Sequence, residues 1–217
     1  MSSALPSLSL LEARILGVLV EKEKITPDAY PLTLNSLTAG CNQKTSRDPV
    51  MNVSESEIQS TLEELRRRLL VLETYGASGR VLRYAQNFGK CYGLPQASVS
   101  LLAILMLRGA QTVSELRANC ERLYRFDDTS TVEAYLEELA ARSSGALVIK
   151  LPKQHGSREH RWAHLLCGEP NLPTDHGKPR HDDSSDNPEL EERVAQLERE
   201  VAELRNAINQ ITSKIGG

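Results

Sequence analysis

Several features common in proteins are scarce or missing in this 217-residue chain. Aromatic residues make up only 4% of it, so its core must be built mainly from aliphatic side chains, which the 40% hydrophobic content can supply. The longest apolar run, residues 101–107, is much shorter than the roughly 20 residues that cross a bilayer. The first residues also lack the basic stretch and apolar core of a signal peptide. We therefore expect a cytoplasmic protein without membrane contact.

A strong excess of positive charge is missing too. Residues 1–95 carry a net charge of +1, residues 96–170 carry 0, and residues 171–217 carry −4. None of these regions has the basic excess typical of a dedicated nucleic-acid-binding protein. Net charge does not describe how charges are distributed, so a local basic patch stays open.

Motifs for catalysis, metals and cofactors are also missing. Cys41, Cys91, Cys120 and Cys167 form no C-x-x-C pair, and we expect free, mostly buried thiols in a reducing compartment. The chain has neither a glycine-rich phosphate loop nor a nucleophile elbow. On a strand, the side chains of His160 and His164 would lie about 13 Å apart, too far for one zinc ion. The sequence predicts no enzyme, no cofactor and no metal site.

The clearest pattern present is a heptad repeat at the end of the chain. Its apolar residues alternate four and three apart, at Leu190, Val194, Leu197, Val201, Leu204, Ile208, Ile211 and Ile215. β-Branched residues at position a with mostly leucine at d favour two parallel strands. Complementary pairs such as Arg193 with Glu198 of the second strand agree with this orientation. The sequence therefore predicts a parallel homodimer through this coil.

The first part of the chain reads as three helices and a hairpin. The first helix starts near Leu8, the second covers Leu32–Cys41 and the third covers Ser54–Arg68. The hairpin pairs Leu70–Tyr75 with Arg80–Ala85. Serine or threonine followed three residues later by glutamate marks capping boxes at Ser9, Ser54, Thr112 and Ser130. Three helices followed by a hairpin is the order of a winged helix.

The same order recurs further along the chain. Helices are predicted over Ser98–Arg108, Thr112–Tyr124 and Ser130–Arg142, and a hairpin over Leu147–Leu151 and Arg158–Leu165. Two matches support a duplication: residues 99–102 resemble residues 8–11, and residues 136–139 repeat residues 62–65. The fold class is thus mainly α with small β-hairpins (α+β). We expect winged-helix domains at 1–95 and 96–167, a flexible linker at 168–187 and the coil at 188–217.

Distinctive stretches of sequence suggest a family. They are Leu11–Arg14, Thr26–Pro27, Tyr30–Leu32 and above all Cys41–Asn52, with Leu107–Thr112, Glu115–Arg117 and the coil in support. In these the chain resembles the YceH-like family of uncharacterised bacterial proteins over nearly its whole length. The resemblance implies tandem winged helices followed by a coil, and it implies no reaction.

A set of basic and hydroxyl residues could contact DNA phosphates. Four lie in the polar loop after the second helix and six on the hairpins: Lys44, Thr45, Ser46, Arg47, Arg80, Arg83, Lys150, Lys153, Arg158 and Arg161. Alternatively, Asn42, Asp48 and Asn52 close the loop through bonds to the backbone, or the loop is a protein-docking surface. The hairpin charges could equally protect strand edges.

Two functions remain open on these grounds. The first is a non-enzymatic, dimeric DNA-binding protein, similar to a transcription regulator. The second is an interaction scaffold whose winged helices dock a partner protein. Acidic residues on the third helices, such as Glu55, Asp127 and Glu133, favour the second function because phosphates repel carboxylates.

Overall fold

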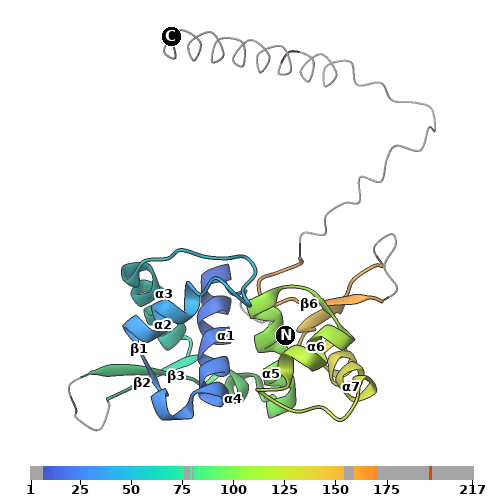
Figure 1. Cartoon of the computed structure of the whole chain (residues 1–217), viewed down its shortest axis with the longest axis horizontal. Coiled ribbons are helices and arrows are strands. Elements are labelled where there is room, and N and C mark those ends of the chain that lie inside the picture. The colour runs from blue at the N-terminus through green and yellow to red at the C-terminus, as the bar shows by residue number, and fades with distance from the viewer. Residues whose placement is uncertain (1–6, 76–78, 80, 154–158, 171–195, 197–217) are drawn as a thin grey trace, which may run out of the picture. The chain divides into compact units, whose positions relative to one another are not determined.

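A computed structural model describes residues 7–75, 79, 81–153, 159–170 and 196. The chain divides into two compact units, residues 1–172 and 173–217, and only Gln196 of the second unit lies among the described residues. The first unit mixes α-helices with small antiparallel sheets (Figure 1). The eight residues predicted to form the coiled-coil dimer lie outside the described residues.

The first half of this unit contains three helices of eight residues or more and a sheet. Its elements are α1 (Leu10–Ile25), η1 (Pro27–Ala29), β1 (Leu32–Thr33), α2 (Leu34–Cys41), α3 (Glu55–Arg67), β2 (Val71–Tyr75) and β3 (Leu82–Gln86). The sheet is antiparallel in the order β1-β3-β2. The helix α4 (Phe88–Tyr92) then leads to the second half.

The second half repeats this plan. Its elements are α5 (Gln96–Arg108), β4 (Gln111–Thr112), α6 (Val113–Cys120), α7 (Thr129–Ala140), β5 (Val148–Lys150) and β6 (Arg161–His164). The sheet order β4-β6-β5 corresponds to β1-β3-β2. The registers agree as well, because Thr33 lies opposite Arg83 and Thr112 opposite Arg161. We call residues 8–88 and 96–166 the first and second repeats.

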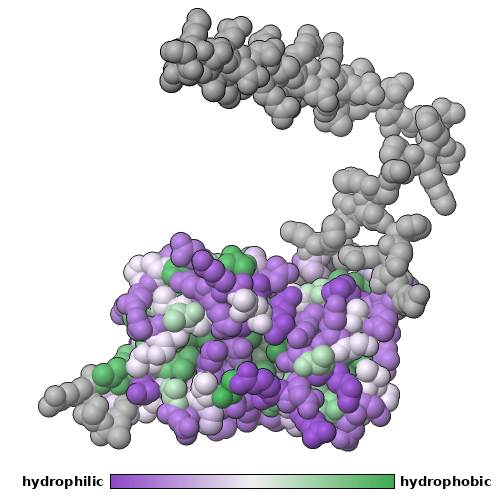
Figure 2. Space-filling model, in the orientation of Figure 1, coloured by the Kyte–Doolittle hydropathy of each residue, from purple (hydrophilic) through white to green (hydrophobic). Residues whose placement is uncertain are grey.

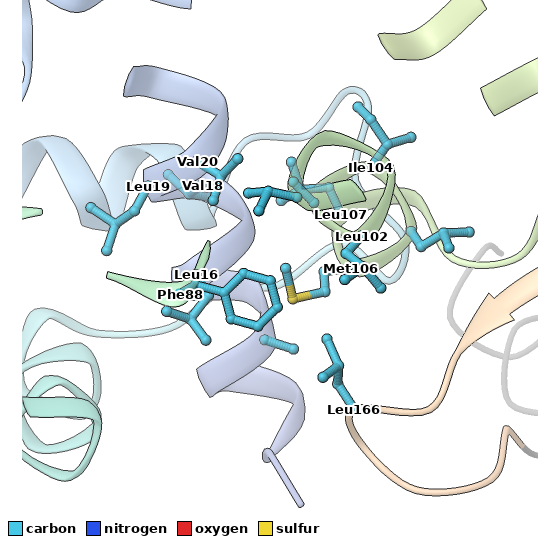
Figure 3. Close-up of a cluster of buried hydrophobic side chains, with 14 of the residues drawn as sticks. Leu16, Val18, Leu19, Val20, Phe88, Leu102, Ile104, Met106, Leu107 and Leu166 are labelled. Carbon is cyan, nitrogen blue, oxygen red and sulfur yellow. The ribbon is translucent and has the colours of Figure 1, made fainter. Parts of the chain in front are cut away.

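The helices α1 and α5 lie side by side at the centre of the unit (Figure 1). Every residue from Glu12 to Val20 of α1 and from Ala97 to Leu107 of α5 is buried. Apart from Glu12, Arg14, Ser98 and Ser100 these residues are apolar or glycine, and a helix that is apolar on nearly all sides is typical of a position deep inside a protein. Figure 3 shows Leu16 of α1 and Met106 of α5 in one cluster with Phe88 and Leu166. Both repeats thus share one core.

A glycine lets these two helices approach closely. A Cβ atom on Gly17 would lie 2.9 Å from Cγ of Leu107, a distance that real Cβ atoms essentially never show. Another contact joins the repeats at the start of α1, where the Leu8 amide donates to the Leu166 carbonyl at 2.7 Å. The repeats are therefore joined both by helix packing and by a backbone hydrogen bond.

Most of the predicted helix starts are confirmed. Capping boxes with both reciprocal bonds begin α1 at Ser9, α3 at Ser54 and α6 at Thr112. The box predicted at Ser130 is wrong: Asp128 caps α7 by accepting from the Thr131 amide at 2.7 Å. An aspartate two residues upstream competes for the same orphan amides, and its carboxylate is the stronger acceptor.

One of the matches that suggested the duplication is also corrected. Ser9 is the cap of α1, whereas Ser100, its partner in the match, lies within α5 and bonds back to the Gln96 carbonyl. The duplication itself is better supported by the sheets and by the helix pairs. Leu37 and Leu116 are buried at the same point of α2 and α6.

Short elements were missed by the sequence analysis. The strands β1 and β4 turn each expected two-stranded hairpin into a three-stranded sheet. Each is only two residues long and directly precedes a threonine-capped helix, so it leaves no alternating pattern to detect. The helix α4 was not predicted either. Among the described residues, no helix combines the length and apolarity needed to cross a membrane.

Candidate functional site

The polar loop between α2 and α3 is closed by its own side chains. Asn42 donates from Nδ2 to the Val53 carbonyl and accepts from the Val53 amide, both at 2.8 Å. These two bonds join the ends of the loop as a backbone pair would. The interpretation of Asn42 as a loop-closing residue is confirmed.

Arg47 lies inside this loop rather than on its surface. Its side chain has no exposed surface, and Nη2 lies 2.5 Å from a carboxylate oxygen of Glu21 on α1. Nε also donates to the Gly40 carbonyl at 3.2 Å. Because the guanidinium is enclosed and paired, the prediction that Arg47 contacts phosphate does not agree with the structure.

The same loop also connects the two repeats. The Asp48 amide donates to the Leu107 carbonyl at 2.8 Å, and Arg108 donates to Oγ of Ser46 at 2.8 Å. Leu107, which accepts the first bond, and Arg108, which donates the second, are the last two residues of α5. We call residues 42–53 the clasp, since they bind the second repeat from within the first.

A buried arginine of α1 donates hydrogen bonds to the clasp and to the end of α2. Arg14 donates to the Cys41 carbonyl at 3.2 Å and to the Pro49 carbonyl at 2.6 Å. Burial, and then the neighbouring charge of Arg47, lower the pKa of Arg14. The sequence analysis missed this role. A signal was present, because Arg14 follows Leu11 by three residues and precedes Val18 by four, on the apolar stripe of the helix.

The remaining candidates of the loop divide into exposed and engaged residues. Lys44 and Thr45 are exposed, and Thr45 accepts from Nε2 of Gln43 through its carbonyl at 3.2 Å. Ser46 is half-buried and bonded to Arg108. Of the four loop residues predicted to bind phosphate, Lys44 and Thr45 are the ones at the surface.

Arg83 and Arg161 occupy equivalent places in the two sheets. Arg83 donates to the Pro31 carbonyl, and Arg161 donates to the Ala110 carbonyl, each at 2.7 Å. Arg161 also forms an ion pair with Glu115 at 3.0 Å. These bonds fix the strands β1 and β4 to their sheets, so both arginines have a structural role that the sequence analysis did not foresee.

Of the other hairpin candidates, two lie among the residues that the structure describes and two lie outside them. Lys150 forms an ion pair with Glu133 at 2.9 Å, and its ammonium lies 5.4 Å from the centroid of the Trp162 ring. Lys153 is exposed. Arg80 and Arg158 lie outside the described residues. The structure therefore does not bring the ten candidates together into one basic surface among the residues it describes.

The outward surfaces of α3 and α7 are acidic. Glu55, Glu63 and Glu64 are exposed on α3, and Glu137 and Glu138 on α7. Arg67, at the end of α3, is paired with Glu64 at 2.8 Å. In a winged helix these third helices would face a nucleic acid, and carboxylates there repel phosphates.

Two buried thiols, Cys41 and Cys120, and the half-buried His164 have environments suited to packing rather than chemistry. All four cysteines are free, and burial raises the pKa of both Cys41 and Cys120 to about 12. A thiol with this pKa is a poor nucleophile at neutral pH. Burial lowers the pKa of His164 to about 4. Within the described residues, no three potential ligands cluster closely enough to hold a metal ion.

These features define a class of protein: a mixed α and β body in which one helix and strand plan occurs twice, clasped into a single unit. The model of a family described as "Protein of unknown function, DUF480" matches residues 8–172, which cover both repeats. The chain belongs to this family, in agreement with the resemblance to YceH-like proteins.

Relatives from several bacteria extend the match beyond the repeats. The chain is 54% identical over 206 residues to a UPF0502 protein of Dechloromonas aromatica (strain RCB), covering 94% of this chain and 96% of the relative. It is 50% identical over 220 residues to a UPF0502 protein of Burkholderia orbicola (strain MC0-3), covering 98% and 91%. A UPF0502 protein of Acidovorax sp. (strain JS42) is 50% identical over 210 residues, covering 94% and 92%.

Proposed function

We propose that this protein is a non-enzymatic scaffold in which two tandem winged helices dock a partner protein. The winged-helix assignment rests on the order of elements and on the sheet orders β1-β3-β2 and β4-β6-β5. In this assignment α3 and α7 are the third helices, and the β2–β3 and β5–β6 hairpins are the wings. We place the protein in the cytoplasm, a compartment that suits its free thiols.

One observation favours a protein partner over DNA. Four of the six basic candidates among the described residues are engaged within the protein, and Arg47 is wholly enclosed. Arg161 and Lys150 are each paired with a glutamate. DNA affinity depends on unneutralised lysine and arginine that can release counterions, and the third helices offer carboxylates instead. Such a surface is better suited to a partner that carries basic residues.

A nuclease-treated pull-down separates the two functions. A scaffold retains a stoichiometric partner after nuclease, and fluorescence anisotropy with generic duplex DNA should show no binding tighter than about millimolar at low salt. Micromolar binding to that DNA with a steep salt dependence would overturn the proposal.

A charge reversal on α7 sharpens the test. Glu137→Lys should reduce the retained partner several-fold, because it opposes the proposed electrostatic match. Glu121→Lys is the matched control, since Glu121 is an exposed glutamate outside α7. Equal loss in both variants would indicate a general effect of charge and not a docking surface.

We further propose that the scaffold is a parallel homodimer. The support is the unbroken heptad pattern from Leu190 to Ile215. Replacing Leu197 and Leu204 with serine should give monomers by light scattering, while circular dichroism shows the repeats still folded. Arg199→Ser with Asn206→Ser, at outward f positions of the heptad, is the control and should stay dimeric. Dimers in both double variants would place the interface elsewhere.

A further inference from the structure

The outer edge of β2 is an unpaired strand edge. β2 is the terminal strand of the sheet β1-β3-β2 and spans five residues, Val71–Tyr75. Among the described residues no strand pairs with its outer side. An open row of amides and carbonyls is a template for another strand, and proteins usually protect such edges with lysine, proline or very short strands.

The equivalent edge in the second repeat has these protections. β5 has only three residues and ends in Lys150, and Pro152 and Lys153 follow closely. Lys150 lies opposite Trp162 as Glu73 lies opposite Tyr84, so these two positions correspond. Two residues further on, Pro152 stands where the first repeat has Tyr75. The first repeat therefore lacks both blocking residues at a position where the second has them.

Exposed apolar side chains accompany the open edge. Leu72 is 45% exposed, Tyr75 is 68% exposed, and Val81 at the start of the return strand is 47% exposed. Leu69, which precedes β2, is also largely exposed. Figure 2 shows hydrophobic surface at the end of the β2–β3 hairpin, on an otherwise mostly hydrophilic face. Apolar side chains on both faces of an open strand can contact alternate side chains of an added strand.

The charged groups that act on Tyr84, in the middle strand of this sheet, are negative on balance. Burial, and then the carboxylates of Glu73 and Glu63, raise the pKa of Tyr84, against the single opposing charge of Arg66. Arg66 itself is already paired with Glu73 at 3.1 Å. The carboxylate of Glu63, which acts on Tyr84, is therefore not offset by Arg66, and a basic residue of a partner could offset it.

We propose that the outer edge of β2 binds an extended segment of the partner protein as an added strand. The segment would carry apolar side chains on both of its faces, because Leu72 and Tyr75 lie on opposite faces of β2, and a lysine or arginine close to Glu63. This inference rests on the proposed scaffold function and gives the partner's binding segment its chemistry. Main-chain bonds supply affinity in such complexes, and alternating side chains supply specificity.

A displayed library of random twelve-residue peptides provides the probe. Peptides selected on the full-length protein should carry apolar residues on both faces of an extended strand and contain a basic residue. A scan of single backbone N-methyl groups along one selected peptide should weaken binding at every second position, because alternate amides of an edge-bound strand point toward β2. Weakening that follows the side chains and not this alternation would overturn strand addition.

Two substitutions on the protein test the same edge. Tyr75→Pro introduces the blocking residue of the second repeat, and Leu72→Lys adds a charge to the strand. Each should weaken the selected peptide by about tenfold or more, the equivalent of one or two lost main-chain bonds. The control is Ile149→Lys, at the position of β5 that corresponds to Leu72, and it should change affinity by less than about twofold. Thermal melts check that all three variants fold.

The outcomes separate this inference from the scaffold function. If the wild type retains a partner from lysate and both β2 variants retain it equally, the strand edge is not the site although the scaffold function stands. If the wild type retains no partner, the scaffold function fails first. If the Tyr75→Pro variant forms a smaller assembly than the wild type, the edge pairs with a second copy of the chain. That result would also contradict binding of a partner segment.

Discussion

The two repeats share a plan and differ in what they leave at the surface. The first has a long loop between its second and third helices that reaches the end of α5, whereas the second has a short one, residues 121–128. The first also has an open strand edge where the second has Lys150 and Pro152. Caps and apolar positions thus define the shared order of helices and strands. The loops and strand edges, which differ between the repeats, decide which surfaces join the repeats and which are open to a partner.

The largest expected effect concerns the loops, each of which is held by arginine. Arg47→Met should destabilise the protein by about 3–5 kcal/mol, since it leaves the partly buried Glu21 only the more distant ammonium of Lys22, at 3.6 Å. Arg117 supports the short loop of the second repeat through the Phe126 and Asp127 carbonyls at 3.3 and 3.0 Å. Arg117→Met should cost only about 1 kcal/mol. Urea unfolding measures both, and equal losses would show that the clasp is no stronger than its counterpart.

The joint between the repeats gives the next effect. Gly17→Val should cost about 1–3 kcal/mol, because the added atoms overlap Leu107 in a closely packed core. Ala134→Val, on the exposed surface of α7, should cost about 0.5 kcal/mol through helix propensity alone. Thermal or urea unfolding gives both values. A Gly17 variant as stable as the wild type would mean that α1 and α5 can move apart to accept the added atoms at no cost in stability.

A pH dependence should be specific to the second repeat. His164 is half-buried and has a pKa of about 4, while Gln86 occupies the corresponding position opposite Val71 in the first repeat. Because the folded-state pKa lies below the ordinary value near 6.5, the unfolded chain binds the proton first, and stability falls as pH drops from about 6.5 toward 4. The loss should be about 2 kcal/mol by pH 5. His164→Gln should remove this part of the dependence in unfolding experiments across that range.

The smallest effect concerns a strained residue before the open edge. Leu69 has a φ of 59° and follows α3 in a position where glycine is usual, with its amide bonded to the Arg66 carbonyl. Leu69→Gly should stabilise the protein by up to about 1 kcal/mol by relieving this conformation. Leu70→Gly, at a buried neighbour, should instead destabilise it by several kcal/mol. A destabilised Leu69 variant would mean that the side chain supports the fold.

The parts of the fold that could be predicted from sequence are those with strong local signals. The caps at Ser9, Ser54 and Thr112 come from reciprocal bonds over three residues, and they placed the helix starts to within two residues. The hairpin β2–β3 was predicted from its β-prone runs and turn. The two-residue strands β1 and β4 could not be, since they depend on pairing with strands about 50 residues away.

The candidate site was less predictable than the fold. Arg47 and Lys44 lie three residues apart in the same polar loop, yet one is enclosed and the other exposed. Which one points inward depends on Glu21 of α1, a contact that no local pattern encodes. The open edge of β2 likewise became visible only when the sheet order showed which strand was terminal.

The continuous burial of α1 and α5 has a consequence for how the protein could be divided. Cutting the chain near Pro95 would leave each piece with a helix whose newly bared side is lined with leucine, isoleucine and valine. Such a piece would expose an apolar helix surface to water and would tend to aggregate or to associate with a second copy. A single copy of the repeat would therefore need a second copy to cover the buried side of its first helix.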